Sequence, residues 1–133
     1  MHATRRLLLV IEDDEGMTTP VPIIRDQLFI GRKEEGNQIR LTGRNVSRRH
    51  CRVLRSGNQV FVEDLQSYNG TWVRGERVVG KAPLGTGDII RVGSFRMAVK
   101  LPVSLPELLS QGAAVDKAQA KAGTSAEATL TAH

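Results

Sequence analysis

The chain carries three short polar segments whose residue types suit the binding of a phosphoryl group. They are Gly31-Arg32, Ser47-Arg48-Arg49-His50 and Asn69-Gly70-Thr71. Arg32 offers a fixed fork of charged donors, Ser47 a hydroxyl, and Arg48 a backbone N–H and a second guanidinium. Asn69 adds an amide that donates and accepts, beside Gly70, which lets the chain turn tightly. These groups predict a receptor for a phosphorylated side chain.

Strands must position these segments, because the segments fall between runs rich in Val, Ile, Leu and Phe. Binding residues usually lie on such connecting loops. Strands are predicted over residues 5–12, 21–25, 28–30, 38–41, 51–54, 60–63, 71–73, 77–79, 88–92 and 95–101. Turns rich in Gly, Pro and Asn separate them, including a hairpin turn over residues 56–59, and no convincing helix is present. The pattern predicts an all-β fold, an antiparallel β-sandwich of two sheets.

Three longer motifs resemble the forkhead-associated (FHA) domain family. They are Phe29-Ile30-Gly31-Arg32, Val46-Ser47-Arg48-Arg49-His50-Cys51-Arg52-Val53 and Asp64-Leu65-Gln66-Ser67-Tyr68-Asn69-Gly70-Thr71-Trp72-Val73. The similarity runs from about Arg5 to Leu101. It implies two sheets with the recognition loops at one end, and a phosphothreonine-binding module without catalytic activity of its own.

The predicted phosphothreonine-binding residues are Arg32, Ser47, Arg48, Tyr68 and Asn69. Arg32 is expected to engage two phosphate oxygens together, while Ser47 donates its hydroxyl and Arg48 donates from its backbone. The resemblance implies that Asn69 holds the backbone of the ligand. Tyr68 is expected to give its hydroxyl to the phosphate or to pack on the peptide, although the family often has a smaller polar residue there.

Three further residues are predicted to support the site. Gly31 is expected to allow a close backbone approach that aims Arg32. His50 is expected to support the loops by hydrogen bonds to the main chain, and Gly70 to provide the tight turn after Asn69. None of the three is expected to touch the phosphate.

The length of 133 residues predicts one binding domain, over residues 1–102. Residues 103–133 are predicted to be an Ala-rich linker or flexible tail, disordered or partly helical. From residue 104 onward the chain has eight alanines, no aromatic residue and only five charged residues.

The charge distribution favours an anionic partner. The formal net charge is +5, and residues 31–55 alone carry eight positive and two negative side chains. The expected partner is a phosphothreonine-containing protein, either a Ser/Thr kinase or a kinase substrate. A single cysteine, a five-residue apolar run at residues 7–11 and no run of membrane-spanning length predict a cytoplasmic protein.

Two other functions stay open. A nucleic-acid binder would use the basic patch, but one Trp, one Tyr and three Phe leave little aromatic surface for stacking. A phosphate-independent scaffold or oligomerisation domain would use the sandwich face or the tail. The oligomeric state is left open.

An enzyme is the least supported class, since no acid–base pair or metal-ligand set is evident. We therefore predict no catalytic residue, cofactor or metal. His50 and Cys51 are neighbours on a strand and point to opposite faces, so Cys51 is expected in the core. The acidic residues 12–15 lack calcium-loop spacing and predict a solvated turn. Residues 18–20 (TTP) are expected to form a loop, with phosphorylation of this loop as an alternative.

Overall fold

The computed structural model of the chain describes residues 6–101 and 128–132. These residues form β1 (Leu8–Glu12), β2 (Thr18–Pro22), β3 (Gln27–Gly31), β4 (Ile39–Thr42), β5 (Cys51–Ser56), β6 (Gln59–Asp64), β7 (Thr71–Val73), β8 (Glu76–Arg77), β9 (Lys81–Leu84), β10 (Ile90–Val92), β11 (Phe95–Lys100) and β12 (Ala128–Thr131). No helix long and apolar enough to cross a membrane occurs in these two ranges.

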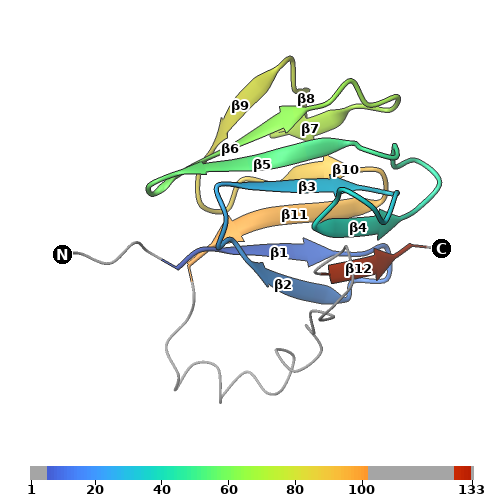
Figure 1. Cartoon of the computed structure of the whole chain (residues 1–133), viewed down its shortest axis with the longest axis horizontal. Coiled ribbons are helices and arrows are strands. Elements are labelled where there is room, and N and C mark those ends of the chain that lie inside the picture. The colour runs from blue at the N-terminus through green and yellow to red at the C-terminus, as the bar shows by residue number, and fades with distance from the viewer. Residues whose placement is uncertain (1–5, 102–127, 133) are drawn as a thin grey trace.

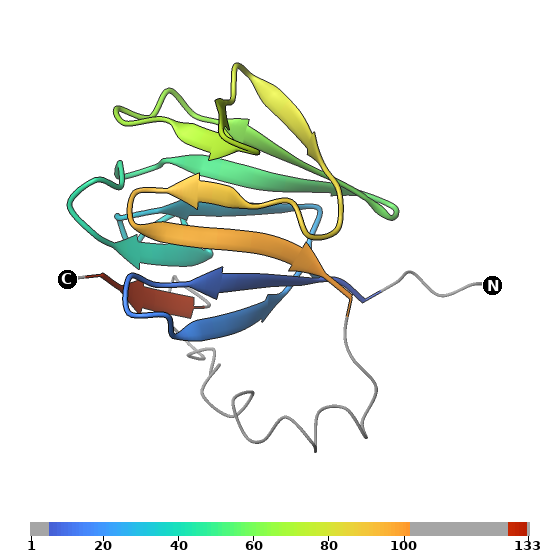
Figure 2. The same ribbon diagram turned by 180° about the vertical axis from the view of Figure 1, so that it is seen from behind.

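The strands build two sheets that pack face to face (Figures 1 and 2). We call them sheet A, in the order β2-β1-β11-β10-β7-β8, and sheet B, in the order β12-β4-β3-β5-β6-β9. Pairing is antiparallel except at β4, which runs parallel to both β3 and β12. The predicted all-β sandwich of two sheets is confirmed.

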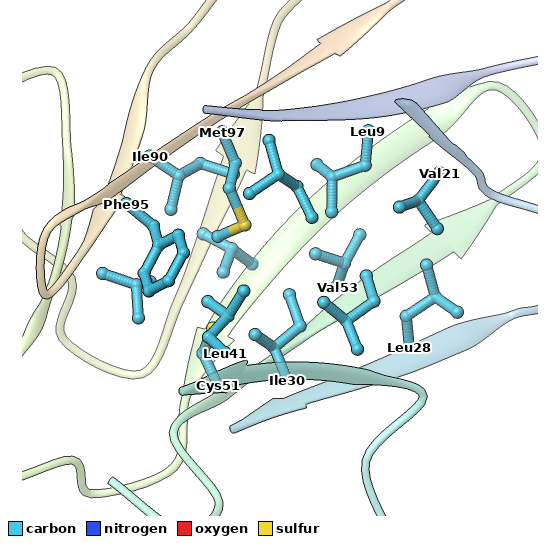
Figure 3. Close-up of a cluster of buried hydrophobic side chains, with 14 of the residues drawn as sticks. Leu9, Val21, Leu28, Ile30, Leu41, Cys51, Val53, Ile90, Phe95 and Met97 are labelled. Atoms are coloured by element: carbon cyan, nitrogen blue, oxygen red, sulfur yellow. The ribbon is translucent and has the colours of Figure 1, made fainter. Parts of the chain in front are cut away.

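Alternating side chains of the two inner faces form the core (Figure 3). In β1 the side chains of Leu9 and Ile11 are fully buried, and in β3 those of Leu28 and Ile30. This period of two is the geometry of a strand with one face on the core. Phe95 is the largest fully buried side chain among the described residues, so mainly aliphatic groups fill the interior.

Strand β2 begins three residues earlier than the sequence predicted. Residues 18–20 were expected to form a loop, but Thr18 pairs with Glu12 and continues the hairpin with β1. β2 is an edge strand, where the missing N–H groups of Pro20 and Pro22 are tolerated. The preceding acidic stretch is a turn, as predicted, in which Asp13 Oδ1 accepts hydrogen bonds from nearby main-chain N–H groups.

The prediction of a flexible tail was wrong for residues 128–131, which form strand β12. Residues 128–131 lie in the segment 103–133, which we expected to be a flexible tail, but they pair with β4 in the register Ala128–Ile39 and Leu130–Leu41. Ala128 and Leu130 are buried, and the intervening Thr129 is exposed. The unpaired N–H and C=O groups at the outer edge of β4 supply the hydrogen bonds. The rest of the predicted tail, residues 103–127 and 133, lies outside the described residues.

The sandwich brings the three polar segments to one end. Ile30 pairs with Cys51, and Cys51 with Asp64, so β3 ends where β5 begins and β6 ends. Residues 31–32, the β4–β5 loop (43–50) and the β6–β7 loop (65–70) therefore meet at the same end, at the right of Figure 1. We call it the site end.

We predict that replacing Leu130 with alanine lowers the free energy of unfolding by about 2 kcal/mol, because the substitution removes buried apolar volume. Thr129→Ala, on the exposed face of the same strand, is the control and should change stability by less than about 0.5 kcal/mol. Urea unfolding of both variants measures the difference. Equal, small effects would show that β12 adds nothing to the stability of the sheet.

Candidate functional site

The buried residue His50 joins strand β3 and the two loops of the site end. His50 Nδ1 accepts a hydrogen bond from the Ser47 N–H at 3.0 Å, and Nε2 donates to the Gly70 carbonyl at 2.9 Å. The main-chain N–H of His50 donates to the Ile30 carbonyl at 2.9 Å, and its carbonyl accepts from the Leu65 N–H at 3.0 Å. One residue thus bonds to β3, to its own loop and to the β6–β7 loop.

These partners fix the protonation state of His50. An N–H group of Ser47 needs an acceptor, so Nδ1 must carry no proton and the ring must be neutral. Burial lowers the pKa of His50 below 6.5, while the hydrogen bond to Gly70 and the charge of Asp64 oppose this shift. The site end is therefore built around an uncharged imidazole.

Arg32 is held at its base and leaves its charged tip open. Its N–H donates to the Ser47 carbonyl at 2.9 Å, and its Nε donates to the Val46 carbonyl at 3.0 Å. Within the described part of the chain, its two terminal amino groups have no partner. The guanidinium is exposed and oriented, which are the properties a phosphate-binding arginine requires.

Ser47 and Arg48 also keep donors available. Ser47 Oγ accepts a hydrogen bond from the Tyr68 N–H at 3.0 Å, so its own proton can be donated to another acceptor. The main-chain N–H and the exposed guanidinium of Arg48 donate no hydrogen bond to any described residue. The Arg48 carbonyl, in contrast, is fixed by the Lys33 N–H at 3.1 Å and Asn37 Nδ2 at 2.9 Å.

Gly31 lies against the main chain of the β4–β5 loop. A Cβ atom at this position would overlap the Arg48 carbonyl oxygen and would lie 2.8 Å from the carbonyl carbon. Both are backbone atoms, so no side chain can move aside to make room. The absence of a side chain at Gly31 therefore brings Arg32 and Arg48 onto the same surface.

Hydrogen bonds to neighbouring side chains hold the Asn69-Gly70 turn in place. Gly70 has a φ of +92°, which is accessible to glycine at little cost, and its N–H donates to Ser67 Oγ at 3.0 Å. Ser67 and Thr71 in turn donate their hydroxyls to Asp64 Oδ1 at 2.5 and 2.7 Å. Asp64 thus organises the loop that presents Asn69.

Asn69 and Tyr68 stand at the surface of this loop. Among the described residues, the Asn69 amide makes only a long contact of 3.4 Å, to the Asn45 carbonyl, so it is available for a peptide backbone. Trp72 Nε1 donates to the Asn69 carbonyl at 3.2 Å. The Tyr68 side chain is 88% exposed.

Sequence reasoning missed two supporting residues, Asp64 and Asn37. Asp64 is the first residue of the third motif. Its role could have been predicted, because an Asp at a strand end followed by a Ser three residues later favours a turn closed by the Asp side chain. Asn37 is fully buried and donates to the carbonyls of Lys33 and Arg48, whereas its Oδ1 has no partner among the described residues. No local pattern marks Asn37, because both of its partners are main-chain atoms.

Other arginines of the basic segment have structural contacts. Arg49 lies over the Phe29 ring, with 4.6 Å from its guanidinium carbon to the centroid. Arg52 pairs with Glu63 at 2.6 Å. These contacts give both arginines a structural role.

Cys51 is fully buried in the core, as predicted. Burial, together with the charge of Asp64, raises the pKa of its thiol to about 12. A thiol in this state is not a nucleophile near neutral pH.

Among the hollows on the described part of the chain, two lie at opposite ends of the sandwich. One of about 390 Å³ adjoins the site end and is lined by Asn45, Asn69, Trp72, Gly75, Arg91 and Gly93. A larger one of about 770 Å³ is lined by residues of the β1 start, the β2–β3 connection and the β5–β6 turn. None of the eight predicted site residues lines the larger hollow, so it is not part of this site.

The model of the FHA domain family matches residues 28–93. The transcriptional regulatory protein EmbR of Mycobacterium tuberculosis is 40% identical over 63 residues, which cover 47% of this chain and 16% of EmbR. FhaA of the same organism is 31% identical over 93 residues, which cover 70% of this chain and 17% of FhaA. The chain therefore spans less than a fifth of the length of either relative.

Solved structures show the same likeness. The FHA domain of FhaA, crystallised with the intracellular domain of Rv3910, is 34% identical with a TM-score of 0.60, and the match covers 71% of this chain and 99% of that domain. An FHA domain from a study of phosphothreonine-dependent interactions is 31% identical with a TM-score of 0.63, and the match covers 74% of this chain and 99% of that domain. EmbR in complex with a low-affinity phosphopeptide is 28% identical with a TM-score of 0.62, covering 73% and 25%.

We predict that Gly31→Ala displaces the β4–β5 loop and lowers the free energy of unfolding by about 1–3 kcal/mol, because the new methyl overlaps fixed backbone. Gly85→Ala is the control, since its Cβ would meet only the Asp88 carboxylate at 3.4 Å. Urea unfolding and amide chemical shifts of residues 47–50 measure the two effects. Unchanged shifts in Gly31→Ala would contradict the close approach described above.

We predict that the free energy of unfolding decreases as the pH is lowered, because His50 then becomes protonated. The pKa of His50 lies below 6.5 in the folded state and near 6.5 in the unfolded state, so the unfolded chain binds more protons between the two values. The contribution is complete above pH 6.5 and is lost as the pH falls towards the folded pKa, with a slope of at most about 1.4 kcal/mol per pH unit.

Urea unfolding between about pH 7.5 and 5.5 measures this loss. His50→Gln, which does not titrate, should lack that slope, and an NMR titration of the wild-type imidazole reads its pKa directly. A pKa of 6.5 or above would contradict the fixed neutral tautomer.

Proposed function

This chain belongs to the FHA domain family, and on that basis we propose that it is a non-enzymatic module that binds phosphothreonine in a partner protein. Residues 1–102 would carry the binding site, and β12 would complete sheet B. A module of this kind recruits a protein after a Ser/Thr kinase has acted on it. We propose that the partner is such a kinase or its substrate, in a cytoplasmic setting.

One observation carries the proposal. Three kinds of donor have no partner among the described residues: the terminal amino groups of Arg32, the hydroxyl proton of Ser47 and the main-chain N–H of Arg48. Hydrogen bonds to Arg32 Nε and Ser47 Oγ hold these two side chains in place. A phosphothreonine brings a charge of about −1.5 to −2 and three acceptor oxygens at pH 7. These donors suit the charge of that ligand and are numerous enough for its three oxygens.

We propose distinct roles for the remaining residues. Asn69 would hold the ligand backbone, because its amide can donate and accept at once. Tyr68 would contact the phosphate or the peptide from its exposed position. Gly31, His50 and Gly70 would act indirectly, by keeping the loops in place.

The relatives support a phosphorylated protein ligand. A structure of EmbR holds a low-affinity phosphopeptide, and the FhaA domain has been crystallised with the intracellular domain of Rv3910. Charge-assisted hydrogen bonds contribute about 1.5–3 kcal/mol each, so two or three of them would dominate the affinity. Removal of the phosphate from the ligand should then abolish useful binding.

We predict that Arg32→Ala weakens binding of a phosphothreonine peptide by about 30-fold or more, the equivalent of about 2 kcal/mol. The measurement is a titration by calorimetry or fluorescence anisotropy with a degenerate phosphothreonine peptide library and its unphosphorylated twin. Ser47→Ala should weaken binding by a smaller factor, because a neutral donor is lost.

Arg44→Ala is the matched control, since Arg44 lies exposed in the β4–β5 loop and carries the same charge. Its affinity should stay within about threefold of wild type, as expected for a charge that makes no direct contact. Equal losses in both variants, with steep salt dependence, would favour a general anion or nucleic-acid surface. Binding of a partner without phosphate would favour the scaffold.

A further inference from the structure

Four exposed side chains form a row across the outer face of sheet A. Trp72 of β7 lies opposite Arg77 of β8 and Arg91 of β10, and Arg91 lies opposite Arg96 of β11. All four are exposed, whereas the residues beside them in β7, β10 and β11 point into the core. We call Arg77, Trp72, Arg91 and Arg96 the basic row. Figure 2 views the molecule from the side of sheet A.

The row concentrates positive charge without balancing it. Arg91 and Arg96 are directly opposite each other, and like charges in that position destabilise a sheet. Arg96 pairs with Glu12 at 3.1 Å, but the Arg91 guanidinium has no ion pair or hydrogen bond within the described residues. Three arginines thus face one carboxylate, which leaves the row with a net charge of +2. An anion bound at Arg91 would relieve the repulsion.

The row also contains a flat apolar surface. The Arg77 guanidinium carbon lies 6.0 Å from the centroid of the Trp72 ring, near the outer limit for a cation–π contact. Trp72 remains 37% exposed beside it. An extended peptide can pack on the ring while its acidic side chains reach the arginines.

The row is continuous with the site end. Trp72 Nε1 donates to the carbonyl of Asn69, the residue proposed to hold the ligand backbone. The hollow of about 390 Å³ lies between them and includes Asn69, Trp72 and Arg91 in its lining. Strands are about 4.8 Å apart, so the row extends about 14 Å, the length of four or five extended residues.

We propose that the basic row binds an acidic stretch of the same ligand, a few Asp or Glu residues from its phosphothreonine. Charge complementarity selects this occupant, and the acidic turn that begins at Glu12 limits the row beyond Arg96. The inference rests on the proposed function, since the phosphothreonine anchors the ligand at Arg32. It adds a determinant of ligand choice that lies on a sheet face and outside the phosphate-binding loops.

Three phosphothreonine peptides test the proposal by fluorescence anisotropy at low ionic strength. One carries four Glu residues after the phosphothreonine, one carries them before it, and the neutral reference carries Gln at all these positions. Wild type should bind one acidic peptide at least about fivefold more tightly than the reference. Arg91→Gln and the double variant with Arg96→Gln should lose this preference and keep the affinity for the neutral peptide.

Lys100→Gln is the matched control, because Lys100 lies exposed near the other end of β11 and its loss changes the net charge equally. It should keep the preference for the acidic peptide. The proposal is overturned if all three peptides bind wild type equally, or if Lys100→Gln loses the preference as fully as Arg91→Gln. It is also overturned if Arg91→Gln impairs binding of a single-stranded oligonucleotide and leaves the acidic peptide unaffected.

The neutral peptide separates the two proposals. If it fails to bind wild type, the proposed function fails and this inference fails with it. If it binds through Arg32 without any gain from acidic residues, only the basic row is refuted.

Discussion

The geometry of the site end depends on one buried, neutral imidazole. His50 accepts from Ser47, donates to Gly70 and bonds through its main chain to Ile30 and Leu65. The end of β3, the β4–β5 loop and the β6–β7 loop are thereby fixed to one another. A ring with two different nitrogens suits this position, because one partner is a donor and the other an acceptor.

The polar groups around the imidazole are also hydrogen-bonded within the protein. Main-chain carbonyls accept hydrogen bonds from Arg32 Nε and Asn37 Nδ2. The Asp64 carboxylate accepts hydrogen bonds from the hydroxyls of Ser67 and Thr71. Among the described residues, donors of Arg32, Ser47 and Arg48 are left without a partner at this end of the sandwich. A binding site whose donors are held before the ligand arrives loses less entropy on binding.

The register of the strands in sheet A also determines which side chains lie together on its outer face. Side chains opposite one another on adjacent strands must share a face, so Trp72, Arg77, Arg91 and Arg96 lie together although the sequence separates them. The resulting charge lies next to the loops of the proposed phosphate site. Both surfaces are therefore open to one extended ligand.

The sequence by itself determined the fold class and predicted the residues of the candidate site. Alternation of aliphatic residues gave the strands, and the motifs around Arg32, Ser47 and Asn69 carried the resemblance to the FHA family, because these are local patterns. Its errors were also local. Thr18–Pro22 contains two prolines, and Ala128–Thr131 lies in a stretch rich in alanine, so neither has the composition of a typical strand.

Only the tertiary structure decided which residues are in contact with one another. Strand β12 pairs with the open edge of β4. Asn37 and Arg32 donate hydrogen bonds to main-chain carbonyls, and no pattern of side chains in the sequence predicts such partners. The pairing of β7, β10 and β11 placed Arg91 between Trp72 and Arg96. These features depend on strand register, and register is set by the packing of the whole core.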